Sequence, residues 1–266
     1  YTRADIHKMA TTHLTSFSDD GEYLAHSSSD GTLRIFECAT GTLKQEYSSS
    51  LHLSAITSAL TWSRHKRESV SSPKAKKKRL SKSPQKESNV DDLKLIALGT
   101  TTGSINLYSF AKGALHTQLT GGHSFQVNDV CWHLSKPQLF SCSDDQSVVQ
   151  WDLKKGKQKH KWKCDSSGVH SICQCSQKHL LTASHSIKLW DLDTRTVLQT
   201  LTGHSSPIFQ LLPVWLTSGS LDASYVLSVA VDDRHINVWN CDETSNEKGP
   251  IASFSVPDEP VSMSLS

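Results

Sequence analysis

The sequence lacks a long apolar run. Its longest apolar stretch, PIFQLLPVWL at 207–216, is too short to cross a bilayer and contains Gln210 and two prolines. We therefore expect no membrane partner. The chain starts at Tyr1 and stops at Ser266 inside an alternating pattern. This predicts that residues 1–266 are truncated at both ends, so that an N-terminal targeting signal would not be visible.

Regularly paired cysteines are also missing. The seven cysteines are odd in number and have no paired spacing, which argues against a disulfide framework. A reducing compartment, the cytosol or the nucleus, fits this composition better.

Signatures of catalysis and metal binding are absent too. The sequence contains no G-x-S-x-G, P-loop, G-x-G-x-x-G or H-E-x-x-H motif. The densest group of possible ligands is Cys164, His170, Cys173, Cys175 and His179, whose spacing matches no common zinc pattern. Strand alternation would place Cys173 and Cys175 on one face and His170 on the other. We therefore expect no catalytic residues, no metal and no cofactor, and interpret the chain as a binding scaffold rather than an enzyme.

Acidic residues are scarce in one segment, which is strongly basic. Residues 64–88 hold ten Lys or Arg and two Glu, a net charge of +8. The remainder holds 18 basic and 24 acidic residues, a net charge of −6, although the whole chain is close to neutral at +2. An acidic globule therefore carries one basic segment.

Five segments share an ending. They are GTLRIFE (31–37), GSINLYS (103–109), SVVQWDL (147–153), SIKLWDL (186–192) and HINVWNC (235–241). Each places an aromatic residue after alternating aliphatic positions, at intervals of 72, 43, 39 and 49 residues. A period of about 40–45 residues that ends in a WD-like dipeptide is typical of a four-stranded propeller blade. The interval of 72 exceeds this period by about the length of the basic segment, which predicts an insertion within the second blade.

These repeats resemble the WD-repeat β-propeller family over about residues 13–256. The resemblance implies an all-β propeller of five recognisable blades. Residues VPDEPVSMSLS at the end of the chain are predicted to start a sixth, in a fragment of a seven-bladed propeller.

The resemblance also implies a buried structural tetrad in each blade. In the third blade it would comprise His123, Ser141, Asp145 and Trp151, with Ser143 on the same strand face as an alternative to Ser141. An indole N–H and an imidazole buried between strands need such partners.

The other blades depart from this pattern. The fifth keeps His204, Asp233 and Trp239 but has Val229 at the predicted serine position, and the fourth lacks the Gly-His pair. Phe36 and Tyr108 replace Trp in the first two blades.

The basic insertion, 64–90, is rich in Ser, Lys and Pro without aromatic residues, which predicts disorder. One interpretation is a solvated loop without a role. A second is a nuclear localisation signal read by an import receptor, formed by Lys74, Lys76, Lys77, Lys78 and Arg79. Contact with RNA phosphates is compatible with either. Ser72 and Ser83 each precede proline and are candidate phosphorylation sites that would cancel part of the charge.

The run LIALGTTTGSINLYS with KGALHTQL and GGH resembles the t-UTP (UtpA) subunits of the small-subunit processome. The resemblance extends to the basic insertion and to RHINVWN and SFSVPDEPVSMSLS. It implies a scaffold in the nucleus and nucleolus that acts in ribosomal RNA transcription, pre-rRNA processing and small-subunit biogenesis. Its implied partners are other WD-repeat processome subunits and the 5′ external transcribed spacer of pre-rRNA, contacted directly or through the complex.

An alternative from another class is a substrate receptor of a cullin-type ubiquitin ligase. Such receptors often carry W-D-x-R after an inner strand. The three corresponding stretches here are WDLK (151–154), WDLD (190–193) and WNCD (239–242), and none has the arginine.

Overall fold

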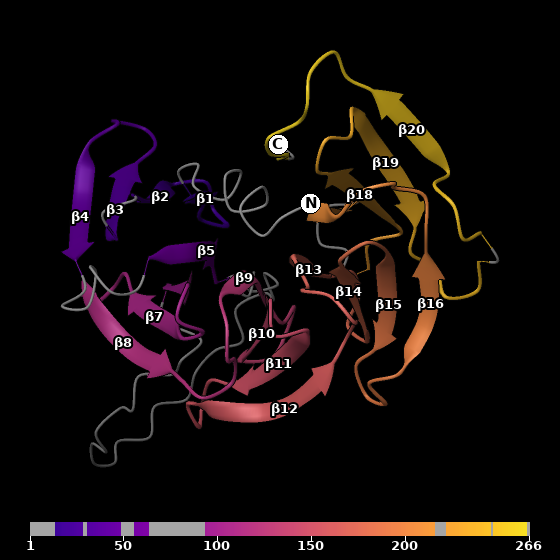
Figure 1. Ribbon diagram of the computed structural model, residues 1–266. Coiled ribbons are helices and arrows are strands. Elements are labelled where there is room, and N and C mark those ends of the chain that lie inside the picture. Colours follow the sequence, from indigo (N-terminus) through magenta and orange to yellow (C-terminus); the bar gives the residue numbers. More distant parts are fainter. Residues whose placement is uncertain are drawn as a thin grey trace, which may run out of the picture.

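The computed structural model describes residues 14–28, 31–48, 56–63, 94–215, 222–245 and 247–264. They form five four-stranded antiparallel sheets, each a meander in chain order, that follow one another around an arc (Figure 1). No helix occurs in this part of the chain, so none that could span a membrane does either. The predicted all-β fold with five propeller blades is confirmed.

Each blade takes four consecutive strands. The first comprises β1 (Leu14–Phe17), β2 (Tyr23–Ser27), β3 (Thr32–Glu37) and β4 (Leu43–Ser48). The second comprises β5 (Thr57–Trp62), β6 (Leu95–Thr100), β7 (Ile105–Ser109) and β8 (Ala114–Leu119). The third comprises β9 (Val127–Trp132), β10 (Gln138–Ser143), β11 (Ser147–Asp152) and β12 (Lys157–Lys163). The fourth comprises β13 (Ser171–Gln174), β14 (His179–Ala183), β15 (Ile187–Asp191) and β16 (Val197–Leu201). The fifth comprises β17 (Ile208–Val214), β18 (Tyr225–Ala230), β19 (His235–Asn240) and β20 (Ala252–Ser255).

The apolar core lies between the blades. Leu139, Val149 and Trp151 of the third blade pack with side chains of the second, whereas Phe140 and Val148 belong to a cluster shared with the fourth. Because side chains alternate along a strand, each middle strand sends one set of residues to each neighbouring blade. A blade therefore buries both faces only when it has a neighbour on each side.

Polar contacts also join the innermost strands of adjacent blades. Ser58 Oγ on β5 donates to the carbonyl of Val127 on β9 at 2.5 Å. The half-buried carboxylate of Asp129 on β9 accepts from the Ile172 N–H at 3.0 Å and from Ser171 Oγ at 2.8 Å on β13. These contacts fix the position of each blade relative to the next.

The residues that follow β20 lie against the fifth blade. The side chain of Gln210 on β17 donates to the Met263 carbonyl at 2.9 Å and accepts from the Met263 N–H at 2.7 Å. Residues 256–264 do not form a β-strand. The sixth blade predicted there remains a prediction.

The basic insertion falls between two paired strands. The Ser63 N–H donates to the Leu95 carbonyl at 2.8 Å, and the Leu95 N–H donates to Ser63 Oγ at 2.9 Å. Residues 64–93 lie outside the described residues, but their two ends are therefore joined by the pairing of β5 with β6.

Deleting residues 66–88 is expected to leave the thermal midpoint of unfolding nearly unchanged. The flanking strands already pair through Ser63 and Leu95, and shortening a long loop changes the closure entropy only slightly. Differential scanning calorimetry of the two chains would check this. A clearly lower midpoint for the deletion variant would mean that the segment packs on the blades.

Trp151→Ala is expected to lower the free energy of unfolding by about 3–5 kcal/mol, because it empties a large buried site. The side chain is 0% exposed and lies between the second and third blades. Phe254→Ala is the control, since Phe254 is 59% exposed and its loss should cost less than about 0.5 kcal/mol. Urea unfolding curves that show equal losses would contradict the packing described for Trp151.

Candidate functional site

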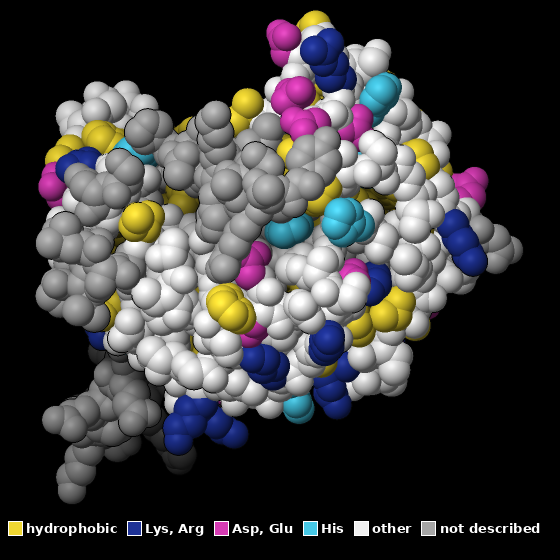
Figure 2. Space-filling model, viewed as in Figure 1, with side chains coloured by type: hydrophobic (Ala, Val, Ile, Leu, Met, Phe, Trp, Pro, Cys, Tyr) yellow, Lys and Arg dark blue, Asp and Glu magenta, His cyan; other side chains and the backbone are white. Residues whose placement is uncertain are grey.

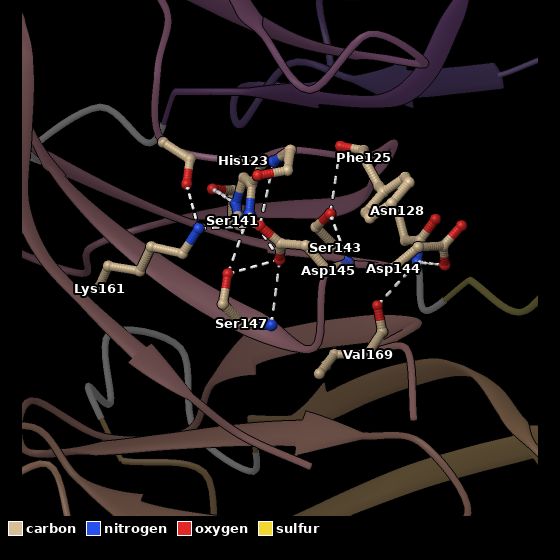
Figure 3. A network of polar contacts seen from close by, with 12 residues as sticks. His123, Phe125, Asn128, Ser141, Ser143, Asp144, Asp145, Ser147, Lys161 and Val169 are labelled. Carbon is tan, nitrogen blue, oxygen red and sulfur yellow. Dashed lines mark hydrogen bonds and ion pairs between the residues drawn. The ribbon is translucent and has the colours of Figure 1, made fainter. Parts of the chain in front are cut away.

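The third blade contains a chain of hydrogen-bonded side chains that links its strands (Figure 3). The indole N–H of Trp151 on β11 donates to Ser141 Oγ on β10 at 2.9 Å. Ser141 Oγ lies 2.7 Å from His123 Nε2, and His123 Nδ1 lies 3.1 Å from Asp145 Oδ1. The structure thus brings together the four residues of the predicted tetrad.

The direction of these bonds follows from the donors available. A carboxylate only accepts, so His123 Nδ1–H donates to Asp145 and His123 Nε2 accepts from the Ser141 hydroxyl. This Ser-His-Asp order also occurs in nucleophilic hydrolases, where the hydroxyl must reach a substrate. Ser141 is 0% exposed and its oxygen already accepts the Trp151 N–H. The arrangement therefore serves to stabilise the blade.

Two further residues complete the network and were not predicted. Ser147 Oγ donates to Asp145 Oδ1 at 2.5 Å. Lys161 Nζ on β12 donates to Asp145 Oδ2 at 3.0 Å and to the Gly122 carbonyl at 2.7 Å (Figure 3). Ser147 lies two residues after Asp145, and a serine at this place in a turn could have been predicted to bind the aspartate. No sequence signal indicated Lys161, because its position depends on the register in which β12 pairs with β11.

The electrostatics of the network centre on Asp145. Burial opposes ionisation of this carboxyl group, but hydrogen bonds from His123, Ser147 and Lys161 outweigh burial and hold its pKa well below the ordinary range. The carboxylate is therefore charged at neutral pH.

Gly122 has a steric role next to the network. A Cβ atom at this position would overlap the ring of Trp151. The Gly-His pair noted in the sequence thus combines a residue without a side chain, which admits the indole, with the histidine that joins the tetrad.

The fifth blade has a complete tetrad, which corrects the assignment of Val229. Ser228 Oγ accepts from Trp239 Nε1 at 2.7 Å and lies 2.6 Å from His204 Nε2, and His204 Nδ1 lies 2.7 Å from Asp233 Oδ2. The prediction failed because the turn between β18 and β19 holds one residue more than the corresponding turn of the third blade. Counting back four positions from Asp233 therefore stopped at Val229, one residue short of Ser228.

The other blades keep parts of the network. In the fourth, Trp190 Nε1 donates to Thr182 Oγ1 at 2.9 Å, so threonine takes the serine position. In the second, the Tyr108 hydroxyl donates to Gln45 Oε1 of the first blade at 3.0 Å. The aromatic residue at this position thus finds a polar partner even without histidine.

Ser143, the alternative to Ser141, stabilises a turn instead. Its hydroxyl donates to the Phe125 carbonyl at 3.2 Å and accepts from the Asp145 N–H at 3.1 Å (Figure 3). Nearby, Asn128 Nδ2 donates to Asp144 Oδ1 at 2.7 Å.

The cysteine and histidine group does not converge. Cys173 and Cys175 pack in the core between the fourth and fifth blades, whereas Cys164 packs between the third and fourth. Within the described residues, no three His, Cys, Asp or Glu side chains are placed to share a metal ion. The predicted localisation signal at Lys74, Lys76, Lys77, Lys78 and Arg79 and the phosphorylation sites at Ser72 and Ser83 lie outside the described residues.

Asp145→Asn is expected to make the free energy of unfolding depend less steeply on pH in acid. Because the folded state lowers the pKa of this group, its contribution is complete above about pH 5 and declines steadily as the pH falls below the ordinary value of 3.8 toward the folded-state pKa. Urea unfolding measured from pH 6 to pH 3 should therefore show a steeper decline for the unmodified chain than for the variant.

The matched control for this measurement is Asp258→Asn, at an exposed position outside the network. It should keep the steep decline of the unmodified chain. Equal slopes for Asp145→Asn and the unmodified chain would contradict the role given to Asp145.

Comparisons with known proteins agree with this architecture. The family model described as "WD domain, G-beta repeat" matches residues 5–37, 114–152 and 195–240. Two of these matches end one residue after a blade tryptophan, at Asp152 after Trp151 and at Asn240 after Trp239.

Two relatives are similar in sequence. Human WD repeat-containing protein 43 is 41% identical over 252 residues, which cover 91% of this chain and 37% of the human protein. U3 small nucleolar RNA-associated protein 5 of Saccharomyces cerevisiae is 29% identical over 154 residues, which cover 56% of this chain and 23% of the yeast protein. The chain thus spans between about a quarter and two fifths of the length of these relatives.

Two solved structures share the fold. The structure of U3-55K matches with a TM-score of 0.71 at 16% identity, covering 91% of this chain and 64% of that one. A chain of the mitotic checkpoint complex matches with a TM-score of 0.69 at 17% identity, covering 92% and 65%. At these identities the likeness shows the fold alone. This chain is a WD-repeat β-propeller chain that is similar to WD repeat-containing protein 43 over nine tenths of its length.

Proposed function

We propose that this chain is the propeller of a nucleolar scaffold subunit of the small-subunit processome, in its t-UTP subcomplex. In this role it supports ribosomal RNA transcription, pre-rRNA processing and small ribosomal subunit biogenesis. It binds other WD-repeat subunits through its blades and acts without catalysis of its own.

The observation that carries this proposal is the similarity to WD repeat-containing protein 43, which covers 91% of the chain and is not confined to the general repeat pattern. The yeast relative supports the proposal by its name, which associates that protein with U3 small nucleolar RNA. The burial of the tetrads supports a scaffold, because the Ser141 and Ser228 hydroxyls are 0% exposed.

The charge distribution supports delivery to the nucleus. The insertion carries a net charge of +8 on a remainder of −6, and clustered Lys and Arg are what import receptors bind. We assign the signal to Lys74, Lys76, Lys77, Lys78 and Arg79, with phosphorylation of Ser72 and Ser83 as a means to weaken it. The ends of the insertion lie at Ser63 and Leu95, at the edge of the second blade, where added residues leave the core intact.

Affinity purification of the full-length protein with mass spectrometry and RNA sequencing tests the scaffold role. We expect other WD-repeat processome subunits and the 5′ external transcribed spacer of pre-rRNA to be enriched. Recovery of cullin adaptors instead would overturn the proposal in favour of a ubiquitin-ligase receptor, although none of the three WD-like dipeptides is followed by the arginine common in such receptors.

Replacing the five basic residues 74 and 76–79 with alanine tests the localisation signal. The variant is expected to shift from the nucleus to the cytosol, since import receptors bind clustered positive charge. Fluorescence imaging beside the Ser72→Ala and Ser83→Ala double variant, which keeps the charge, would check this. Unchanged nucleolar accumulation of the alanine variant would show that the address lies elsewhere.

A further inference from the structure

A cavity of about 100 Å³ lies between the third and fourth blades, where three cationic side chains meet. Lys136 comes from the turn between β9 and β10, Lys159 from β12, and Arg195 from the turn between β15 and β16. Asp193 is the one carboxylate among the lining residues. In the described part of the chain, no carboxylate oxygen lies within 4.0 Å of any of the three cations. The cavity therefore concentrates positive charge that the protein does not neutralise.

A β-bulge brings Lys159 to this cavity. Gln150 pairs with His160 and Trp151 with Gln158, which leaves Lys159 as the extra residue on β12. At a bulge, the extra side chain and that of the next residue point to the same face of the sheet. Lys159 therefore lies on the same face as His160, which also lines the cavity.

Arg195 reaches the cavity from a strained backbone. Its φ is +60°, and the corresponding position in the first three blades is Gly41, Gly113 or Gly156, with φ of +67°, +62° and +60°. Glycine adopts this conformation without steric cost, whereas a long side chain does not. Three described non-glycine residues have such a φ, and Arg195 is the one among them that lines the cavity, which supports a function for its side chain.

Two histidines report the same positive potential. Burial, with Lys136 and Lys159 as additional causes, lowers the pKa of His133 to about 4. Burial likewise lowers the pKa of His160, with Arg195 and Lys159 as the additional causes. His133 Nδ1 accepts the N–H groups of Ser135 and Lys136, so the neutral ring has its donor at Nε2.

The positive charge continues along the rim of the third blade. Figure 2 shows Lys and Arg side chains grouped over β12. Residues 153–163 contain six lysines and no acid. Lys161 pairs with Asp145 and Lys155 with Asp152, which leaves four lysines without a carboxylate partner among the described residues. Because the bulge reverses the alternation, Lys157 and Lys159 lie on the side of His160, which lines the cavity, whereas Lys161 and Lys163 lie on the opposite side of β12.

We propose that the cavity between the third and fourth blades binds a backbone phosphate of single-stranded RNA whose neighbouring phosphates follow β12. Arg195 and Lys159 bind the phosphate oxygens, and His133 Nε2–H adds a neutral donor. The further exposed lysines of this rim favour a polyanion over a phosphopeptide, which brings one phosphate and would leave them unused. This inference rests on the proposed function, in that it gives the propeller a direct contact with pre-rRNA.

The test is fluorescence anisotropy with a labelled 20-nucleotide poly(U) RNA and the full chain. The parent protein carries alanine at Lys74, Lys76, Lys77, Lys78 and Arg79, so that RNA binding by the basic insertion does not obscure binding at the cavity. Lys159→Gln and Arg195→Gly are added to this parent together. Two lost phosphate contacts should lower the slope of log Kd against log salt by about 1.4 and weaken binding about 25-fold at 0.1 M KCl.

Arg195→Gly separates binding from folding. Glycine relieves the strain at φ +60°, so this variant should unfold at the same or a higher temperature while it binds RNA more weakly. The matched control is Lys44→Gln, at the bulged position of β4 in the first blade, which removes the same charge away from the cavity. The control should bind RNA as the parent does.

Three outcomes would overturn the inference. They are unchanged RNA affinity in the double variant, an equal loss in Lys44→Gln, and loss of binding to a labelled phosphoserine peptide but not to RNA. The measurement uses the isolated chain, so it is independent of whether processome subunits copurify. A negative RNA-binding result would not contradict the scaffold role, and a negative copurification result would not contradict the phosphate site.

Discussion

The chain of hydrogen bonds from Trp151 to Asp145 is the interaction on which the third blade depends. An indole N–H, a hydroxyl and an imidazole are all removed from water between the second and third blades, and each has a partner there. Loss of one partner leaves the others buried without compensation, which costs more than the bond itself contributes. The same chain recurs in the fifth blade through Trp239 and Ser228. Between these blades, apolar packing and single contacts such as that of Asp129 with the Ile172 N–H fix the position of each sheet.

The sequence predicted much of this architecture because the repeat is periodic. Aromatic residues at regular intervals located the five blades, and the resemblance to WD-repeat propellers implied the third-blade tetrad. The prediction failed where structure depends on one residue more or less in a turn, as for Val229 in place of Ser228. It also missed Lys161 and the cavity at Lys159, since both depend on the register and bulge of β12 rather than on any local pattern.

The function proposed here uses the blades as rigid supports. The serine, histidine and aspartate side chains of the tetrads are hydrogen-bonded within the blades, so contacts with a partner are made by surface residues. There the chain carries positive charge in two places, the insertion between Ser63 and Leu95 and the rim around Lys159 and Arg195. The remainder of the chain is acidic, which confines a polyanion to these two places. This distribution supports the proposal that the scaffold receives RNA at defined positions.

Exchange of tryptophan indole N–H groups with deuterium, followed by NMR on ¹⁵N-tryptophan-labelled chain, tests the central claim most directly. Trp151 and Trp239 donate to Ser141 and Ser228 inside complete tetrads, whereas the indole N–H of Trp162, on strand β12, is buried but has no hydrogen-bond partner in the described structure. The account predicts that the first two indoles exchange only when a blade opens, and far more slowly than Trp162. Exchange of Trp151 as fast as that of Trp162 would contradict it.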